Sequence, residues 1–227
     1  MYRRYAIFYT PAPDTPLARF GAEWLGWDSA MGITCAHPDA GDVDVARITE
    51  TPRKYGFHGT IKAPFRLAEE YSAEALGHAL RAFCAQRARV EISGLTIARL
   101  GRFLALVPVG PQPALTLMAG EVVQTLDPFR APLTVGELAK RRQSRLSAAQ
   151  DANLVRWGYP FVLEAFRFHM TLTGRLAKED ACGVEAALDA LLRPLALSPY
   201  VMTGLTLLGE DDAGCFHQIE RYRFGEP

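Results

Sequence analysis

Residues 57–60 are Phe-His-Gly-Thr, and the pattern returns at residues 168–171 as Phe-His-Met-Thr. Ser-Gly-Leu-Thr-Ile at residues 93–97 likewise returns as Thr-Gly-Leu-Thr-Leu at residues 203–207. The members of the two pairs are separated by nearly the same length of chain. Two echoes at one separation indicate an internal duplication, so we expect a protein built from two related halves.

The segments around the two histidine motifs follow a common order. Apolar residues at helical spacing follow each motif, beginning after Ser72 in the first half and ending at Pro194 in the second. A β-like run then follows at residues 90–100 and at residues 200–208. The order also repeats upstream, where strands and helices are expected at residues 5–10, 17–25, 103–109 and 114–126. The fold class is therefore α+β, with two pseudo-symmetric lobes that face each other across a cleft.

A single bilobal domain over residues 1–227 fits this order, with approximate lobes at 1–100 and 101–227. Two segments break the symmetry. Residues 32–52 are rich in Gly, Pro and Asp and are predicted to form a long loop. Residues 134–153 are predicted to add a helix to the second half.

The predicted extra helix carries a basic run, Lys-Arg-Arg-Gln-Ser-Arg, at residues 140–145. Its apolar stripe passes through Leu138 and, at helical spacing, through positions 142, 145 and 149. Arg142 and Arg145 are thus predicted to face inward and to bind a substrate phosphate at the rim of the cleft. The alternative is an ordinary solvated helix face.

Composition narrows the classes of function. The 227 residues are 49% hydrophobic and 22% charged, which is ordinary for a globular protein. Equal numbers of basic and acidic residues, 25 of each, exclude a polyanion binder that relies on overall charge. Glycine-rich phosphate loops of the P-loop or dinucleotide type are absent from the sequence, which argues against a nucleotide kinase or a dehydrogenase. The cysteines are far apart in sequence, as expected of reduced thiols rather than a zinc site.

No targeting or membrane segment is expected. The first residues contain too short an apolar run for a signal peptide. The uncharged stretch at residues 103–120 is interrupted by prolines, so it is predicted to form a strand, a turn and the start of a helix. We expect a cytoplasmic protein with no membrane partner.

The histidine motifs carry the candidate chemistry. Residues i and i+2 of a strand share a face, so each histidine is expected to lie beside the threonine that follows it. If the lobes face each other, one site gathers the following side chains: His58, Thr60, Lys62, His169, Thr171 and Thr173. A single such motif fits a buried strand histidine equally well; the pair at matching positions favours function.

Two imidazoles and two hydroxyls suit phosphodiester chemistry. One neutral histidine can take a proton from attacking water while a protonated partner donates one to the leaving oxygen. The threonine hydroxyls can hold the non-bridging phosphate oxygens, and Lys62 can add positive charge. This mechanism needs no metal and no cofactor.

The longer runs at residues 54–65 and 157–173 resemble the two-histidine (2H) phosphoesterase superfamily. That superfamily includes the RNA 2′,3′-cyclic phosphodiesterases historically called 2′-5′ RNA ligases. Within it, the runs are most similar to a branch associated with bacterial phosphonate-utilisation (carbon–phosphorus lyase) operons. The resemblance implies antiparallel-rich sheets with helices outside and metal-independent opening of a cyclic phosphodiester. The catalytic residues that it implies are His58, Thr60, His169 and Thr171.

Phosphonate catabolism suggests 5-phosphoribosyl 1,2-cyclic phosphate as the candidate substrate, since Lys62 departs from the pattern of the second motif and would suit a doubly anionic molecule. The predicted substrate-binding residues are Tyr55, Lys62, Arg142, Arg145, Tyr159 and Thr173. Three alternatives stay open: an RNA-end 2′,3′-cyclic phosphodiesterase, a non-catalytic module that binds a phosphorylated metabolite, and a metal site formed by the two motif histidines with a carboxylate. The neutral charge disfavours a nucleic-acid partner.

Overall fold

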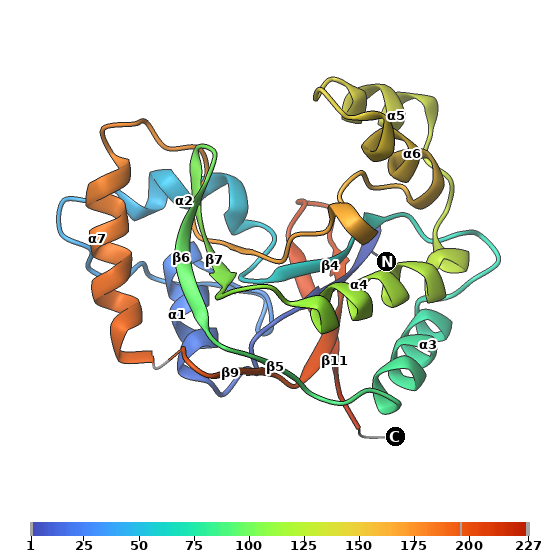
Figure 1. Ribbon diagram of the computed structural model, residues 1–227, viewed down its shortest axis with the longest axis horizontal. Helices are drawn as coiled ribbons and strands as arrows, with labels where there is room; N and C mark the ends of the chain where they lie inside the picture. Colours follow the sequence, from blue (N-terminus) through green and yellow to red (C-terminus); the bar gives the residue numbers. More distant parts are fainter. Residues whose placement is uncertain (1, 196, 226–227) are drawn as a thin grey trace.

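The computed structural model describes residues 2–195 and 197–225. The described strands form one seven-stranded antiparallel sheet, in the order β11-β10-β1-β4-β8-β7-β6, and two small two-stranded sheets, β2-β3 and β5-β9 (Figure 1). The strands are β1 (Arg4–Tyr9), β2 (Trp27–Asp28), β3 (Ile33–Thr34), β4 (Gly59–Phe65), β5 (Val90–Ile92), β6 (Leu95–Leu100), β7 (Phe103–Pro108), β8 (Met170–Thr171), β9 (Tyr200–Met202), β10 (Gly204–Glu210) and β11 (Phe216–Arg223). The helices are α1 (Pro16–Leu25), α2 (Val45–Arg53), α3 (Ala73–Ala85), α4 (Pro113–Thr125), α5 (Val135–Arg142), α6 (Ala148–Trp157) and α7 (Ala181–Leu192). The α+β class predicted from the sequence is confirmed.

The large sheet mixes the two halves of the chain. β10 and β11 come from the C-terminal part but pair with β1, whereas β6 comes from the first hundred residues and pairs with β7. The strand order therefore differs from lobes divided near residue 100. It gives instead one group of β11, β10, β1 and β4 and another of β8, β7 and β6.

The two strand groups join at the histidine motifs. β4 pairs with β8 through Gly59 and Met170, each of which directly follows a motif histidine. A Cβ atom on Gly59 would lie 2.4 Å from the Phe168 ring, closer than carbon atoms can approach. Glycine between His58 and Thr60 thus lets the two motif strands come together.

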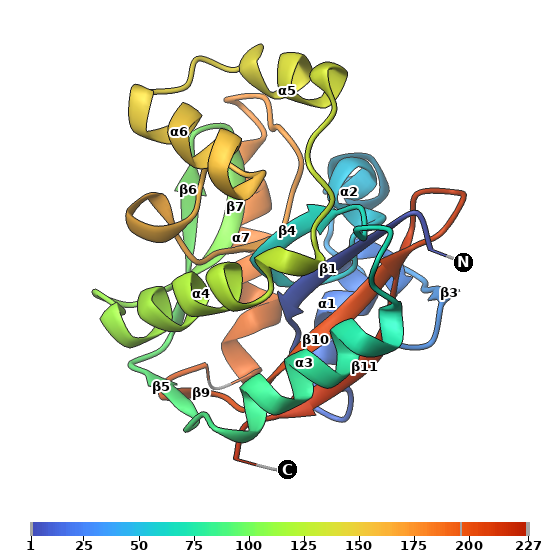
Figure 2. The same ribbon diagram turned by 90° about the vertical axis from the view of Figure 1, so that its right-hand side faces the viewer.

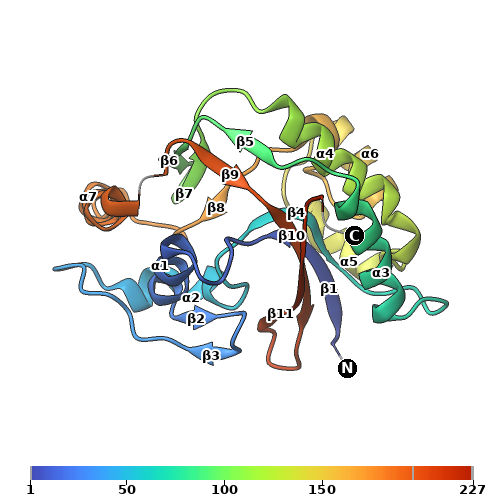
Figure 3. The same ribbon diagram turned by 90° about the horizontal axis from the view of Figure 1, so that it is seen from below.

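Helices cover the sheet from outside. α3 packs on β10 and β11, and α4 packs on β4, while α7 lies beside β6 (Figures 1 and 3). Ser72 begins α3 as predicted, because its hydroxyl accepts a hydrogen bond from the Ala75 backbone N–H at 3.1 Å. The largest hydrophobic cluster lies between these helices and the sheet and includes Ile7, Phe57, Phe168 and Met170.

Two sequence predictions of local structure were wrong. The predicted loop at residues 32–52 contains α2, which begins where the Asp44 carboxylate accepts a hydrogen bond from the Arg47 backbone N–H. The predicted helix at residues 134–153 is two helices, α5 and α6. They separate because Ser147 and Gln150 form a capping box that begins α6.

The α5–α6 pair stands out from the sheet near the end of β4 (Figures 1 and 2). α5 has no buried residue, and Val135 at its start is 86% exposed. No helix formed by residues 2–195 or 197–225 is long and apolar enough to cross a membrane.

Candidate active site

The pairing of β4 with β8 brings the two histidine motifs together. With Gly59 opposite Met170, antiparallel register places His58 opposite Thr171 and Thr60 opposite His169. Side chains alternate across a strand, so these four share one face and Met170 points to the other, buried face. All four are half-buried. We call His58, Thr60, His169 and Thr171 the tetrad.

Each tetrad histidine is held by the backbone carbonyl two residues before it. His58 Nδ1 lies 2.9 Å from the Gly56 oxygen, and His169 Nδ1 lies 2.9 Å from the Arg167 oxygen. A carbonyl oxygen only accepts, so Nδ1 carries the hydrogen in both rings. The other ring nitrogen, Nε2, is the atom that each histidine offers for proton transfer.

The two rings differ in their surroundings. Phe8 of β1 is fully buried and stacks on His58, with ring centroids 3.8 Å apart and an interplanar angle of 19°. His58 Nε2 lies 3.2 Å from the Thr60 hydroxyl. The Phe103 ring lies beside His169, tilted, with a centroid distance of 5.9 Å.

Burial lowers the pKa of His58 to about 4. The Gly56 carbonyl opposes this shift, and the neighbouring His169 adds to it. His58 is therefore neutral at pH 7, with a lone pair on Nε2 that can accept a proton.

Lys62 does not share the face of His58 and Thr60. Phe8 of β1 is opposite Thr60, but the next residue pair is Ile7 with Lys62, so Ile61 is an extra residue in β4. Such a bulge reverses the alternation of side chains, which sends Lys62 to the face of Ile7. Residues at 58, 60 and 62 would have shared a face only in a regular strand.

On that face the Lys62 ammonium group holds two elements together. Its Nζ donates to the Val123 carbonyl near the end of α4 at 3.1 Å and lies 3.4 Å from Asp127 Oδ1. Lys62 is 3% exposed, and burial lowers its pKa to about 8, against an opposing effect of Asp127. Stabilising the carbonyl end of α4 is a structural role for this side chain.

Thr173 also has a structural position. Its hydroxyl accepts a hydrogen bond from the Leu104 backbone N–H at 3.0 Å and donates to the Gly174 carbonyl at 2.9 Å. The residue is 1% exposed. The structure thus uses Thr173 to fasten the end of β8 to β7.

Tyr55 lies beside the tetrad, and Tyr159 lies beside α5. Tyr55 stacks on Phe216, and its ring centroid is 6.1 Å from that of His58. Tyr159 follows α6 and lies beneath the Arg141 guanidinium, 5.4 Å from its ring centroid. Burial raises the pKa of Tyr159, with a smaller contribution from Tyr55, so the two phenols are neighbours.

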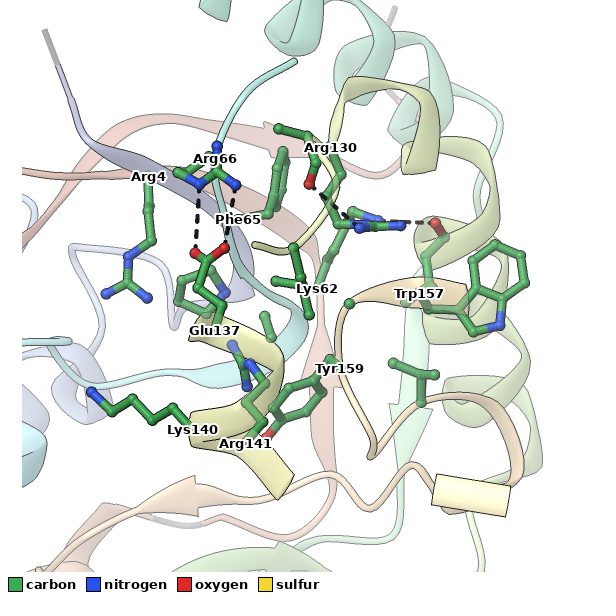
Figure 4. Close-up of a pocket in the computed structure, with 17 residues that line it drawn as sticks. Arg4, Lys62, Phe65, Arg66, Arg130, Glu137, Lys140, Arg141, Trp157 and Tyr159 are labelled. Atoms are coloured by element: carbon green, nitrogen blue, oxygen red, sulfur yellow. Dashed lines mark hydrogen bonds and ion pairs between the residues drawn. The ribbon is translucent and has the colours of Figure 1, made fainter. Parts of the chain in front are cut away.

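The basic run on α5 faces differently from the prediction. Arg142 forms an ion pair with Asp151 of α6 at 2.7 Å, and Arg145 is exposed beyond the end of α5. On the inner side of α5, Glu137 and Arg141 are half-buried, whereas Lys140, which borders the same space, is exposed (Figure 4). The helix is thus rotated from the predicted stripe, because its first turn is fixed by the Thr134–Glu137 capping box and by Arg66.

Between α5 and β4 lies a cavity of about 540 Å³ (Figure 4). We call it the basic cavity, because its charged lining residues are Arg4, Lys62, Arg66, Arg130, Glu137, Lys140 and Arg141. Of these residues, the sequence predicted Lys62 as a site residue and pointed to the run at residues 140–145. Arg4 begins a strand far from the motifs, and Arg66 follows β4, so neither gave a signal.

Two of the remaining histidines, His217 and His37, have local partners. His217 Nε2 lies 2.8 Å from Asp211 Oδ2, and His37 contacts Arg53 at 3.3 Å. In the part of the chain that the structure describes, no group of three or more His, Cys, Asp or Glu side chains is arranged to hold a metal ion.

Fold and site define an α+β protein in which two His-x-Thr strands meet at the centre of one sheet. The chain belongs to the family described as "Protein of unknown function (DUF1045)", whose model matches residues 60–217. The match includes both tetrad threonines and His169, and it begins two residues after His58.

Two curated relatives are each named "Ribose 1,5-bisphosphate phosphokinase PhnN". The protein of Janthinobacterium sp. (strain Marseille) is 39% identical over 97% of this chain and 51% of its own length. That of Laribacter hongkongensis (strain HLHK9) is 32% identical over 96% of this chain and 51% of its own length. The chain thus spans about half the length of the curated relatives that it matches.

Several solved structures align with nearly the whole chain at low scores. E. coli LigT complexed with NADP+ aligns over 100% of both chains with a TM-score of 0.43 and 14% identity. TT0787 of Thermus thermophilus aligns over 98% of both chains with a TM-score of 0.44 and 10% identity. At these scores the alignments carry no argument about function, which must come from the site.

Proposed function

We propose that this protein is a phosphodiesterase that opens a small cyclic phosphate by acid–base catalysis between His58 and His169. The observation that supports this most strongly is that the two imidazole rings make the same backbone hydrogen bond. Each donates Nδ1–H to the carbonyl two residues earlier, and both lie on the same face of adjoining strands with a threonine beside them. A structural histidine does not require such a duplicate.

In the proposed reaction, water attacks the phosphorus and the bond from phosphorus to one ring oxygen breaks. His58 Nε2 accepts the proton that the water loses, and protonated His169 donates the proton that the leaving oxygen gains. The hydroxyls of Thr60 and Thr171 donate hydrogen bonds to the non-bridging oxygens as negative charge develops. The product is a phosphate monoester with a free hydroxyl, and no other reactant is consumed.

The assignment of the base rests on the surroundings of His58. Stacking under Phe8 removes water from this ring and keeps it neutral at pH 7, as a general base requires. The bound phosphate carries negative charge, which stabilises the imidazolium that forms after proton transfer.

The curated relatives support a phosphorylated pentose as substrate. Their shared name refers to ribose 1,5-bisphosphate, a pentose with two phosphates. The kinase activity in that name belongs to proteins about twice as long, and this sequence has no Gly-Lys pair with which to form a P-loop. We therefore propose a ring-opening step on a ribose phosphate for this chain, with 5-phosphoribosyl 1,2-cyclic phosphate from phosphonate catabolism as the candidate.

A phosphorus NMR time course in EDTA tests this function. The protein is incubated with 5-phosphoribosyl 1,2-cyclic phosphate and a nucleoside 2′,3′-cyclic phosphate together, with His169→Ala and His58→Ala as matched controls. We expect the cyclic resonance of the ribosyl compound to disappear with the wild-type protein and to persist with both variants.

Each other outcome is equally informative. Faster loss of the nucleotide resonance would favour an RNA-end phosphodiesterase. Turnover that survives in both histidine variants would exclude the proposed mechanism. Binding without turnover of either compound would favour a module that senses a phosphorylated metabolite.

A further inference from the structure

We propose that the basic cavity binds a terminal phosphate monoester of the substrate, with Arg141 and Lys140 of α5 as its principal ligands. That a cyclic phosphate of the same substrate lies at the tetrad rests on the proposed function. Binding of the monoester to the cavity is argued only from the residues that line it. It would give the molecule a second anion site.

The cavity concentrates positive charge in a chain whose net charge is zero. Most of its cations already have carboxylate partners. Arg4 binds Glu210 through two hydrogen bonds of 2.5 Å, and Arg130 and Lys62 share Asp127. These pairs are held by the fold and leave little charge free.

Lys140 and Arg141 are different, because within residues 2–195 and 197–225 neither has a carboxylate partner. Arg141 is half-buried against Tyr159, which orients its guanidinium along the cavity wall. Lys140 is exposed and lines the same cavity, so these two cations together attract an anion to it. A phosphate monoester offers two negative charges and matches the planar guanidinium with two oxygens.

A third ligand can come from Arg66. Its guanidinium lies 3.2 Å from Glu137 Oε2 and also donates to the Pro132 carbonyl at 2.8 Å. The Arg66–Glu137 pair is partly exposed, and such pairs are weak, so a phosphate in the cavity can compete for this guanidinium.

The cavity and the tetrad are connected through Tyr55 and β4. The Tyr55 ring is 6.1 Å from His58, and the phenol acts electrostatically on Arg4 and Tyr159, which both line the cavity. Along β4, Thr60 of the tetrad and Lys62 of the cavity wall are two residues apart, on opposite faces of the bulged strand, so the cavity adjoins the tetrad at this strand.

The walls also favour a compact ligand over a polynucleotide. Phe65, Val162 and Trp157 line the same cavity as the cations. A volume of about 540 Å³ lies within the range of small-molecule sites. A monosaccharide phosphate places its carbon skeleton against these apolar atoms and its phosphate against α5.

Calorimetric titration with ribose 5-phosphate tests the site without turnover, because this probe contains no diester. Ribose is the uncharged control ligand. The variants are Arg141→Gln, Arg141→Lys and, as a matched control, Arg145→Gln, which removes an exposed cation just beyond α5. Circular dichroism verifies that each variant is folded.

We expect the wild-type protein to bind ribose 5-phosphate and to bind ribose at least about tenfold more weakly. Arg141→Gln should weaken binding of the phosphate about 10- to 100-fold, Arg141→Lys less, and Arg145→Gln should leave it unchanged. Equal binding to the wild-type protein and Arg141→Gln, or equal binding of ribose and its phosphate, would overturn the proposal.

A kinetic comparison separates this site from the proposed function. Ring opening is measured with ribose 1,2-cyclic phosphate and with its 5-phosphorylated form. Arg141→Gln should raise KM for the phosphorylated compound alone, leaving kcat/KM for the other unchanged. If ring opening does not depend on the 5-phosphate, the cavity site is overturned and the proposed function is not. If ribose 5-phosphate binds in an Arg141-dependent way but no ring opening occurs, the proposed function is overturned and the cavity site is not.

Discussion

His58 and His169 occupy duplicate motifs, and their rings are held in the same way, yet their environments are different. Both donate Nδ1–H to a carbonyl at 2.9 Å. Only His58 lies against a parallel aromatic ring, that of Phe8 at 3.8 Å, whereas Phe103 is tilted and 5.9 Å from His169. Duplication thus supplies two imidazoles of one tautomer, and the neighbouring strands make them chemically unequal. An acid and a base need that inequality.

Replacing each histidine in turn should give the largest loss of activity and should show most clearly whether the two residues have different roles. With the cyclic substrate, His58→Ala and His169→Ala should each lower kcat about 100- to 10,000-fold. With bis(p-nitrophenyl) phosphate, whose leaving oxygen needs no proton, His169→Ala should lose far less than His58→Ala. Release of p-nitrophenolate measures both.

The opposite order would assign the acid to His58 and the base to His169. Equal losses with both substrates would show that neither residue acts as an acid toward the leaving group. The wild-type protein and a double variant set the limits of the scale.

The two threonines should show a smaller effect. Thr60→Val and Thr171→Val each remove one donor to a charged oxygen, so kcat should fall about 10- to 100-fold. Thr60 also contacts His58 Nε2 at 3.2 Å, so its loss should additionally move the acidic limb of the kcat/KM profile. Thr→Ser at each position keeps the hydroxyl and should restore most activity. Serine variants as impaired as the valine variants would point to the methyl group rather than the hydroxyl.

The features of the fold and of the site that depend on residues close together in the sequence were predictable from the sequence. The Ser72 cap and the shared face of His58 with Thr60 follow from local spacing, and the structure has both. That the two motif strands adjoin depends on tertiary structure, and only the duplication indicated it. The structural role of Thr173 could not be predicted, because the Leu104 backbone N–H that donates to its hydroxyl is distant in sequence.

Irregularities of one or two residues account for most of the differences between the sequence predictions and the structure. One extra residue, Ile61, moves Lys62 to the opposite face, and no spacing rule anticipates a bulge. A rotation of α5 replaces Arg142 by Arg141 on the inner face, since a helix turns by about 100° per residue. Ser-x-x-Gln at residues 147–150 is a capping-box signal inside a longer helical pattern, and it is what divides that pattern into α5 and α6.

The smallest expected effect concerns stability, and it separates His58 from His169 without a substrate. The pKa of His58 is about 4 in the folded protein and about 6.5 when unfolded, so between these values the unfolded chain binds more protons. Stability should therefore be fully present above pH 6.5 and decline as the pH falls toward 4, by at most about 1.4 kcal/mol per pH unit from this group. Urea unfolding at pH 7 and at pH 5 measures the decline for the wild-type protein, His58→Asn and His169→Asn. The decline should be smaller in His58→Asn than in the wild-type protein, because this variant lacks the group whose pKa is lowered on folding. If His58→Asn kept the full decline, the burial of this ring under Phe8 would not be what keeps it neutral, and the basis for choosing His58 as the base would be lost.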